Sequence, residues 1–181
     1  MDNQNQHRIF TVPNLLSLIR IFLIAPIAIL VWYDDLKLAL ILTVIAMATD
    51  FFDGKIARHF HQTSDLGKIL DPIADKLSCA TLLIVLLLKD KVPLWVVVLI
   101  IGRDVIISIA GVFLVKKYRI VTTSNLIGKL TATSIAFMIV SYIFDLLMLE
   151  KIFLPLTVFM VFLSGFSYLK RFIYIQISDK Q

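Results

Sequence analysis

Residues 92–115 read VPLWVVVLIIGRDVIISIAGVFLV, an apolar run interrupted by the adjacent charges of Arg103 and Asp104. A membrane-spanning α-helix needs about 17–25 predominantly apolar residues, so this run has the length and composition of one. Five more runs of the same character lie along the chain, at residues 15–33, 36–52, 73–88, 126–148 and 152–175. We therefore expect an all-α integral membrane protein with about six transmembrane helices.

The composition of the whole chain supports this interpretation. Of its 181 residues, 59% are hydrophobic and 17% are charged, whereas a soluble domain averages about 45–50% apolar and about 25% charged residues. The excess is too large for one buried core, because a soluble domain must cover itself with polar surface. Disorder and a disulfide-stapled secreted domain are excluded as well, since the chain is apolar and Cys79 is its one cysteine.

The distribution of lysine and arginine predicts the orientation, because cytoplasmic loops carry an excess of these residues. Ten of them lie in the N-terminus, alternate connections and the C-terminus: Arg8, Lys55, Arg58, Lys68, Lys116, Lys117, Arg119, Lys170, Arg171 and Lys180. Four lie in the other connections: Lys37, Lys89, Lys91 and Lys151. We expect one transmembrane domain over residues 1–181, with both termini in the cytoplasm and a short cytoplasmic N-terminal segment, residues 1–14.

The N-terminus also indicates the membrane and the start of the first helix. It lacks the arginine- and serine-rich pattern of an organelle transit peptide, which favours a prokaryotic plasma membrane. Residues 11–14, TVPN, are typical of a helix start, with a proline near the first turn and polar groups that can cap it.

Four aspartates form an ordered pattern around the polar link between the second and third runs. Asp50 and Asp53 close the second run, and Asp71 and Asp75 open the third. On a helix, residues three or four apart share a face, with Cβ atoms about 5–6 Å apart. If the two helices run antiparallel, both pairs meet at the same depth.

Four converging carboxylates in a low-dielectric setting must take up protons or bind cations. Oxygen ligands select magnesium, manganese or calcium, and two such ions about 3.5–4 Å apart are a common device for displacement at phosphorus. Gly54 and Gly67 lack a Cβ and let a bulky ligand approach the backbone. Packing of small residues, together with Ala57, is the alternative interpretation of these glycines.

The full pattern reads Asp50-x2-Asp53-Gly54-x2-Ala57-Arg58-x8-Gly67-x3-Asp71-x3-Asp75. It resembles, at every fixed position, the signature of the CDP-alcohol phosphotransferase family, also called class I CDP-alcohol phosphatidyltransferases. The resemblance implies an integral membrane enzyme that transfers a phosphatidyl group from CDP-diacylglycerol to an alcohol and releases CMP. It also implies a homodimer, with two Mg²⁺ or Mn²⁺ ions per active site.

The resemblance further implies a role for each residue of the motif. Asp50, Asp53 and Asp71 would be metal ligands. Asp75 would be a ligand and also the general base that takes the proton of the acceptor hydroxyl. The CDP group would be held by Gly54, Ala57, Arg58 and Gly67.

The acceptor alcohol is indicated by other residues. Residues 12–20, VPNLLSLIR, are similar to the opening of phosphatidylglycerophosphate synthases and of the cardiolipin synthases of this family. Arg103 and Lys129 lie in apolar segments, and a pocket for the dianion glycerol 3-phosphate needs convergent cations. In relatives these two positions contribute to recognition of the acceptor phosphate. The expected activity is therefore that of a phosphatidylglycerophosphate synthase, with sn-glycerol 3-phosphate as acceptor.

Two alternatives to this expectation remain open. Asp104 resembles the cardiolipin-synthase branch, which would use phosphatidylglycerol as acceptor, and Arg103 could simply pair with Asp104 or with an aspartate of the motif. A small cation transporter is a distant alternative from another class. Transporters often show matching halves, whereas the acidic cluster here lies on a single pair of helices.

Overall fold

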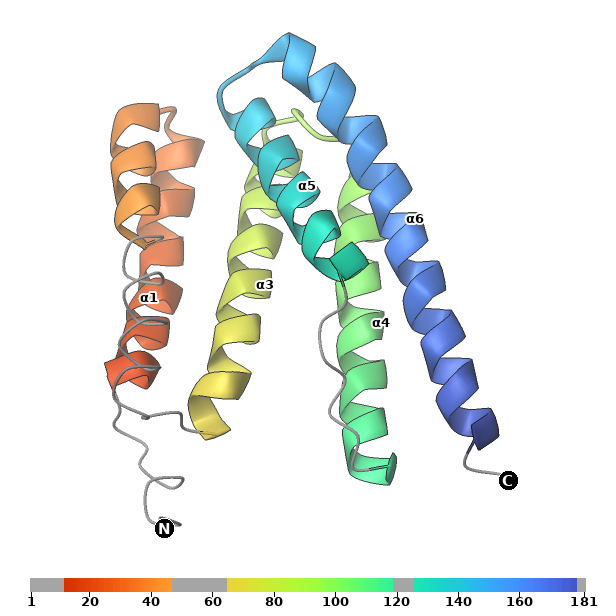
Figure 1. Cartoon of the computed structure of the whole chain (residues 1–181). Helices are drawn as coiled ribbons and strands as arrows, with labels where there is room; N and C mark the ends of the chain where they lie inside the picture. The colour runs from red at the N-terminus through yellow and green to blue at the C-terminus, as the bar shows by residue number, and fades with distance from the viewer. Residues whose placement is uncertain (1–11, 47–64, 119–125, 179–181) are drawn as a thin grey trace. The chain divides into compact units, whose positions relative to one another are not determined.

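The computed structural model describes residues 12–46, 65–118 and 126–178, and all regular structure in these ranges is α-helical. The labelled helices of Figure 1 are α1 (Val12–Trp32), α3 (Asp65–Leu88), α4 (Leu94–Tyr118), α5 (Leu126–Ile143) and α6 (Leu147–Ser178). A further helix, Leu36–Ala46, follows α1. These six helices of the described residues correspond to the six apolar runs, so the all-α class is confirmed.

Three helical segments in the described part of the chain are long and apolar enough to cross a membrane: Leu94–Phe113, Leu126–Ile143 and Leu147–Lys170. Two shorter apolar segments are Ile21–Trp32 and Leu36–Ala46. Large apolar side chains on these helices, such as Phe162 and Phe166, are exposed. This pattern is typical of an integral membrane protein, in which lipid chains replace water around the helices.

The helices fall into two compact units, Met1–Val85 and Leu86–Gln181. The first contains α1, helix Leu36–Ala46 and most of α3. The second contains the end of α3 together with α4, α5 and α6. The single transmembrane domain over residues 1–181 stays a prediction.

In the first unit, α1 begins at Val12, three residues before the apolar run from which it was expected. Pro13 is its second residue, where the fixed φ of proline suits a helix start and the missing N–H is not needed. Residues 1–11 lie outside the described part of the chain, so the predicted capping of this helix start by residues 11–14 stays a prediction. Pro26 lies inside the helix, as membrane helices tolerate.

An aspartate with positive φ stands in each described turn between helices: Asp34 (61°), Asp90 (56°) and Asp145 (51°). Aspartate is among the few residues that adopt this left-handed conformation. In each turn a backbone N–H donates to the carbonyl five residues earlier, the bond that closes a Schellman motif. These bonds join Asp35 to Leu30, Lys91 to Leu86 and Leu146 to Ser141, each at 2.9 Å.

These turns and helix starts correct two expected boundaries. The fifth run was expected to span residues 126–148, but the turn at Asp145 divides it, so that α5 ends at Ile143 and α6 begins at Leu147. The third helix was expected from residue 73, but α3 begins at Asp65. The helix therefore continues through its charged residues, and Asp71 and Asp75 lie within it rather than at its start.

In the second unit, the turns that follow α3 and α5 lie at the same end. Lys91 Nζ is 2.8 Å from both carboxylate oxygens of Asp145 and 3.4 Å from the carbonyl oxygen of Tyr142. This contact joins the two turns, as expected for helices that alternate in direction.

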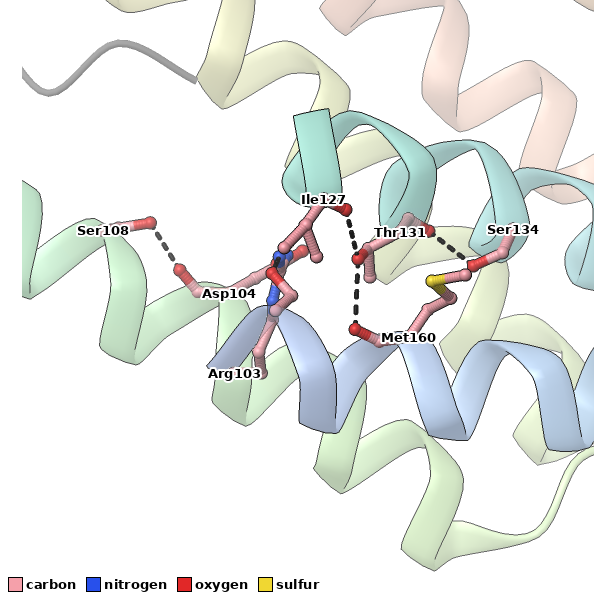
Figure 2. A network of polar contacts seen from close by, with 8 residues as sticks. Arg103, Asp104, Ser108, Ile127, Thr131, Ser134 and Met160 are labelled. Atoms are coloured by element: carbon pink, nitrogen blue, oxygen red, sulfur yellow. Dashed lines mark hydrogen bonds and ion pairs between the residues drawn. The ribbon is translucent and has the colours of Figure 1, made fainter. Parts of the chain in front are cut away.

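Helices α5 and α6 pack side by side along much of their length (Figure 1). The buried hydroxyl of Thr157 donates to the carbonyl of Ser134 at 3.0 Å, from α6 to α5. In the other direction, the buried hydroxyl of Thr131 lies 3.2 Å from the carbonyl of Met160 (Figure 2). Small polar residues of this kind bring membrane helices close together and link them.

Candidate functional site

The described residues contain only part of the eight-residue motif. Its first five members, in residues 47–64, lie outside the described part of the chain: Asp50, Asp53, Gly54, Ala57 and Arg58. The other three, Gly67, Asp71 and Asp75, lie in the first half of α3. Convergence of the two halves of the motif therefore stays a prediction.

Helix α3 places Asp71 and Asp75 one turn apart on a continuous helix, so their positions share a face. Asp75 is exposed, whereas the neighbouring Ala74 is completely buried; the side chain of Asp71 is outside the description. Among the side chains described, no three potential metal ligands come together. The side chains of three of the four motif aspartates, Asp50, Asp53 and Asp71, are not among those described.

The charges of α3 are confined to its first half. Residues 77–88 contain no Asp, Glu, Lys or Arg, whereas residues 65–76 contain five such residues. One half of α3 therefore suits the lipid interior, and the other suits a polar site where charged substrates can approach. Two of the four predicted metal ligands, Asp71 and Asp75, lie in the polar half.

A second polar cluster joins α4 to α6, within the second unit. The side chain of Arg103 is only 13% exposed and that of Asp104 only 19%. Arg103 Nη1 lies 2.5 Å from Asp104 Oδ1, and Arg103 Nη2 donates to the hydroxyl of Ser164, which is completely buried. The carbonyl of Asp104 accepts a hydrogen bond from the hydroxyl of Ser108 at 2.5 Å (Figure 2).

The guanidinium of Arg103 has donors to spare. Its Nε is buried and has no hydrogen-bond partner among the described residues. A buried donor left unpaired costs about 1–3 kcal/mol, and more when it belongs to a charged group. Arginine offers five N–H donors, and the contacts with Asp104 and Ser164 use two of them. The ion pair anticipated as an alternative is thus present, but it leaves donors that an oxygen of a ligand could satisfy.

Lys129 occupies a different environment on α5. It is exposed, and its carbonyl accepts a hydrogen bond from the hydroxyl of Thr133 at 3.1 Å. Thr131 contacts α6, and Lys129 precedes it by two positions. Residues two positions apart in sequence lie about 200° apart around the axis of a helix. Lys129 therefore lies on the side of α5 away from α6. Among the described residues it makes no contact with Arg103, so a pocket shared by the two cations stays a prediction.

Ser164 is a residue of this cluster that the sequence analysis missed. A serine in an apolar run is an ordinary packing residue of a membrane helix, and its contact with Arg103 joins residues 61 positions apart. Spacing along one helix carries no signal for such a pair.

Comparison with known proteins finds one matching protein family and several similar enzymes. A family model described as CDP-alcohol phosphatidyltransferase matches residues 10–163. The CDP-diacylglycerol–glycerol-3-phosphate 3-phosphatidyltransferase of Rickettsia felis is 36% identical over 169 residues, which cover 87% of this chain and 93% of the relative. The protein of the same name from Aquifex aeolicus is 33% identical over 132 residues, which cover 72% of this chain and 74% of the relative.

Cardiolipin synthases of the CMP-forming type match a shorter part of the chain. The synthase of Rattus norvegicus is 41% identical over 121 residues, or 66% of this chain. The match spans only 39% of that longer relative. Because the family model covers most of the chain, and because two relatives above 30% identity match over most of their own length, the chain belongs to the CDP-alcohol phosphatidyltransferase family of phospholipid-synthesising membrane enzymes.

Proposed function

We propose that the protein transfers the phosphatidyl group of CDP-diacylglycerol to sn-glycerol 3-phosphate, giving phosphatidylglycerophosphate and CMP. The observation that carries this proposal is the extent of the match to the Rickettsia felis enzyme named for this reaction, at 87% of this chain and 93% of the relative. Arg103 supports it, since a buried cation with an unpaired donor is suited to an anionic acceptor. Membership of a transferase family argues against the small cation transporter.

The motif aspartates would hold two Mg²⁺ or Mn²⁺ ions. Asp71 and Asp75 share one face of the polar half of α3, and carboxylate oxygens are the donors that these hard cations prefer. The ions, when bound, would neutralise the pyrophosphate of the donor lipid and stabilise CMP as it leaves. Asp50 and Asp53 would complete the ligand set.

The residues of the chain would supply the other steps. Asp75 would take the proton of the acceptor hydroxyl while the oxygen of that hydroxyl attacks the phosphorus of the phosphatidyl group. One P–O bond forms to the acceptor, and the P–O bond to CMP breaks. The exposed position of Asp75 leaves it accessible to the acceptor. The CDP group would be bound by Gly54, Ala57, Arg58 and Gly67.

Arg103 and Lys129 would bind the phosphate of the acceptor. Glycerol 3-phosphate has no acyl chains to hold it in the bilayer, so its affinity must come mainly from charge-assisted hydrogen bonds. The buried Arg103 would provide most of this affinity, and the exposed Lys129 would contribute through longer-range attraction.

A specific observation also favours cardiolipin synthase as a second candidate. Asp104 pairs with Arg103 at 2.5 Å and offsets its charge. A pair with little net charge suits phosphatidylglycerol, which carries one negative charge, better than a dianion. The 41% identity to the rat cardiolipin synthase agrees with this reading over 121 residues.

One assay tests the proposal and separates the two candidates. Purified protein is supplied with CDP-diacylglycerol and with glycerol 3-phosphate or phosphatidylglycerol in turn, and the release of CMP is measured. Release that depends on glycerol 3-phosphate is the expected result. Release with phosphatidylglycerol alone would make the protein a cardiolipin synthase.

The setting of the enzyme is also a proposal. We place it in the plasma membrane of a prokaryote as a homodimer, with both termini in the cytoplasm, where CDP-diacylglycerol would present its nucleotide. The excess of lysine and arginine in the N-terminus, alternate connections and the C-terminus supports this orientation.

A further inference from the structure

One turn of α6, from Met160 to Ser164, is contacted by polar side chains of two other helices. Thr131 of α5 lies 3.2 Å from the carbonyl oxygen of Met160 (Figure 2). Arg103 of α4 donates through Nη2 to the hydroxyl of Ser164. Thr131 and Ser164 are both completely buried. This turn of α6 is therefore bonded to α5 through Thr131, and its Ser164 binds the side chain of Arg103.

The two partners of Arg103 fix its guanidinium in different ways. Asp104 is the next residue on the same helix, so its contact with Nη1 moves together with α4. Ser164 belongs to α6, so its contact with Nη2 relates the guanidinium to a second helix. A guanidinium is planar and its N–H bonds have fixed directions. Two contacts on different nitrogens therefore determine where the unpaired Nε–H points.

We propose that Ser164 is a positioning residue for the acceptor: it holds the guanidinium of Arg103 so that the remaining N–H groups meet the phosphate. This inference rests on the proposed role of Arg103 in binding the acceptor. Holding a long side chain in its binding geometry before the ligand arrives lowers the entropy lost on binding. The hydroxyl of Ser164 acts through Arg103 and touches no substrate.

A simple packing role for Ser164 makes a different prediction. If the serine only lets α4 and α6 approach each other, its replacement by alanine keeps a small side chain and changes little. If it positions Arg103, the same replacement weakens the acceptor in particular. The effect then also depends on whether Arg103 is present.

A double-mutant cycle separates these roles. Ser164→Ala, Arg103→Ala and the double variant are assayed for CMP release at saturating CDP-diacylglycerol, with the acceptor concentration varied. Ser164→Ala should raise the acceptor KM about tenfold, since it removes one hydrogen bond to a charged group. The KM of CDP-diacylglycerol should stay unchanged. In the Arg103→Ala background, removing Ser164 should change the acceptor KM by less than about twofold.

Ser141→Ala is the matched control, because Ser141 is equally buried but donates to the carbonyl of Met138 in its own helix at 2.7 Å. Its acceptor KM should equal that of the unmodified protein. An unchanged acceptor KM in Ser164→Ala overturns the inference, and so does an equal rise with and without Arg103. An acceptor KM that does not respond to Arg103→Ala overturns it as well.

The cycle also distinguishes this inference from the proposed function. It is run with whichever of glycerol 3-phosphate and phosphatidylglycerol supports CMP release. If only phosphatidylglycerol does, the proposed acceptor is wrong, but the cycle still tests Ser164. If glycerol 3-phosphate is used and Ser164→Ala behaves like Ser141→Ala, the proposed function stands and the inference fails.

Discussion

Replacing Arg103 and Lys129 by alanine should weaken acceptor binding unequally, because the two cations differ in burial. The side chain of Arg103 is 13% exposed, whereas Lys129 is exposed. A hydrogen bond to a charged group contributes about 1.5–3 kcal/mol, and an exposed ion pair contributes about 0–1 kcal/mol. Since 1.4 kcal/mol is a factor of ten, Arg103→Ala should raise the KM of glycerol 3-phosphate about ten- to a hundredfold. Lys129→Ala should raise it by no more than about fivefold.

The measurement is the initial rate of CMP release at saturating CDP-diacylglycerol, with glycerol 3-phosphate varied at low and at high ionic strength. Exposed charges are screened over a Debye length of about 10 Å at 0.1 M salt. The effect of Lys129→Ala should therefore shrink as salt is added, while that of Arg103→Ala persists. The KM of CDP-diacylglycerol should not change in either variant.

Loss of stability is the confounding effect, because Arg103→Ala leaves the mostly buried carboxylate of Asp104 without its partner. The double variant Arg103→Ala/Asp104→Ala removes both charges and is the control. Its melting temperature should recover while its acceptor KM stays high. The role of Arg103 is refuted if the single variant keeps the native acceptor KM, or if the double variant restores it.

Four further results are expected. Asp75→Asn keeps the size of the side chain but removes the proton acceptor, so turnover should fall at least about 10²-fold; an unimpaired variant would exclude this general base. Asparagine at each of the other three motif aspartates should abolish CMP release, and chelation should silence the native enzyme until Mg²⁺ or Mn²⁺ is restored; full activity in excess chelator would contradict the two-metal site. In a cysteine-free background, an impermeant thiol reagent on intact cells should label Lys89→Cys and not Ser64→Cys, and the reverse would overturn the orientation. Thr157→Val should lower the free energy of unfolding by about 1 kcal/mol, since its hydroxyl links α6 to α5, whereas Thr133→Val, at an exposed site bonded within its own helix, should change it less.

The helices could be predicted from the sequence because the bilayer sets their length, but several of their ends could not. The start of α1 has a local signal in Pro13. Asp145 lies inside the fifth apolar run, and its left-handed conformation marks the place where the run divides. The early start of α3 was not expected from the apolar run, because residues 65–72 contain three charged residues and a proline. These boundaries depend on turn geometry, which hydropathy does not report.

In the candidate site, too, some features could be predicted from the sequence and others could not. The motif could be found because all eight residues lie within residues 50–75 at fixed spacing. The pairing of Arg103 with Asp104 could be anticipated because the two are adjacent. The contact of Arg103 with Ser164 could not, since it joins two helices across 61 positions. The exposure of Lys129 was also not predictable, because one lysine in an apolar segment does not indicate which face of the helix it occupies.

The ion pair in α4 is itself an argument for a ligand. Hydroxyl contacts such as those of Thr131 and Thr157 link α5 to α6 without any charge. A buried ion pair is a poor device for the same purpose, because removing two charges from water offsets most of their attraction, and a membrane segment makes that removal harder. If α4 needed only to be fastened to α6, uncharged residues would serve as well as Arg103 and Asp104. We therefore expect that Arg103→Leu/Asp104→Asn will melt no lower than the native protein, and that its KM for glycerol 3-phosphate will be raised about ten- to a hundredfold, as in Arg103→Ala. A large fall in melting temperature would instead assign the pair to the stability of the fold.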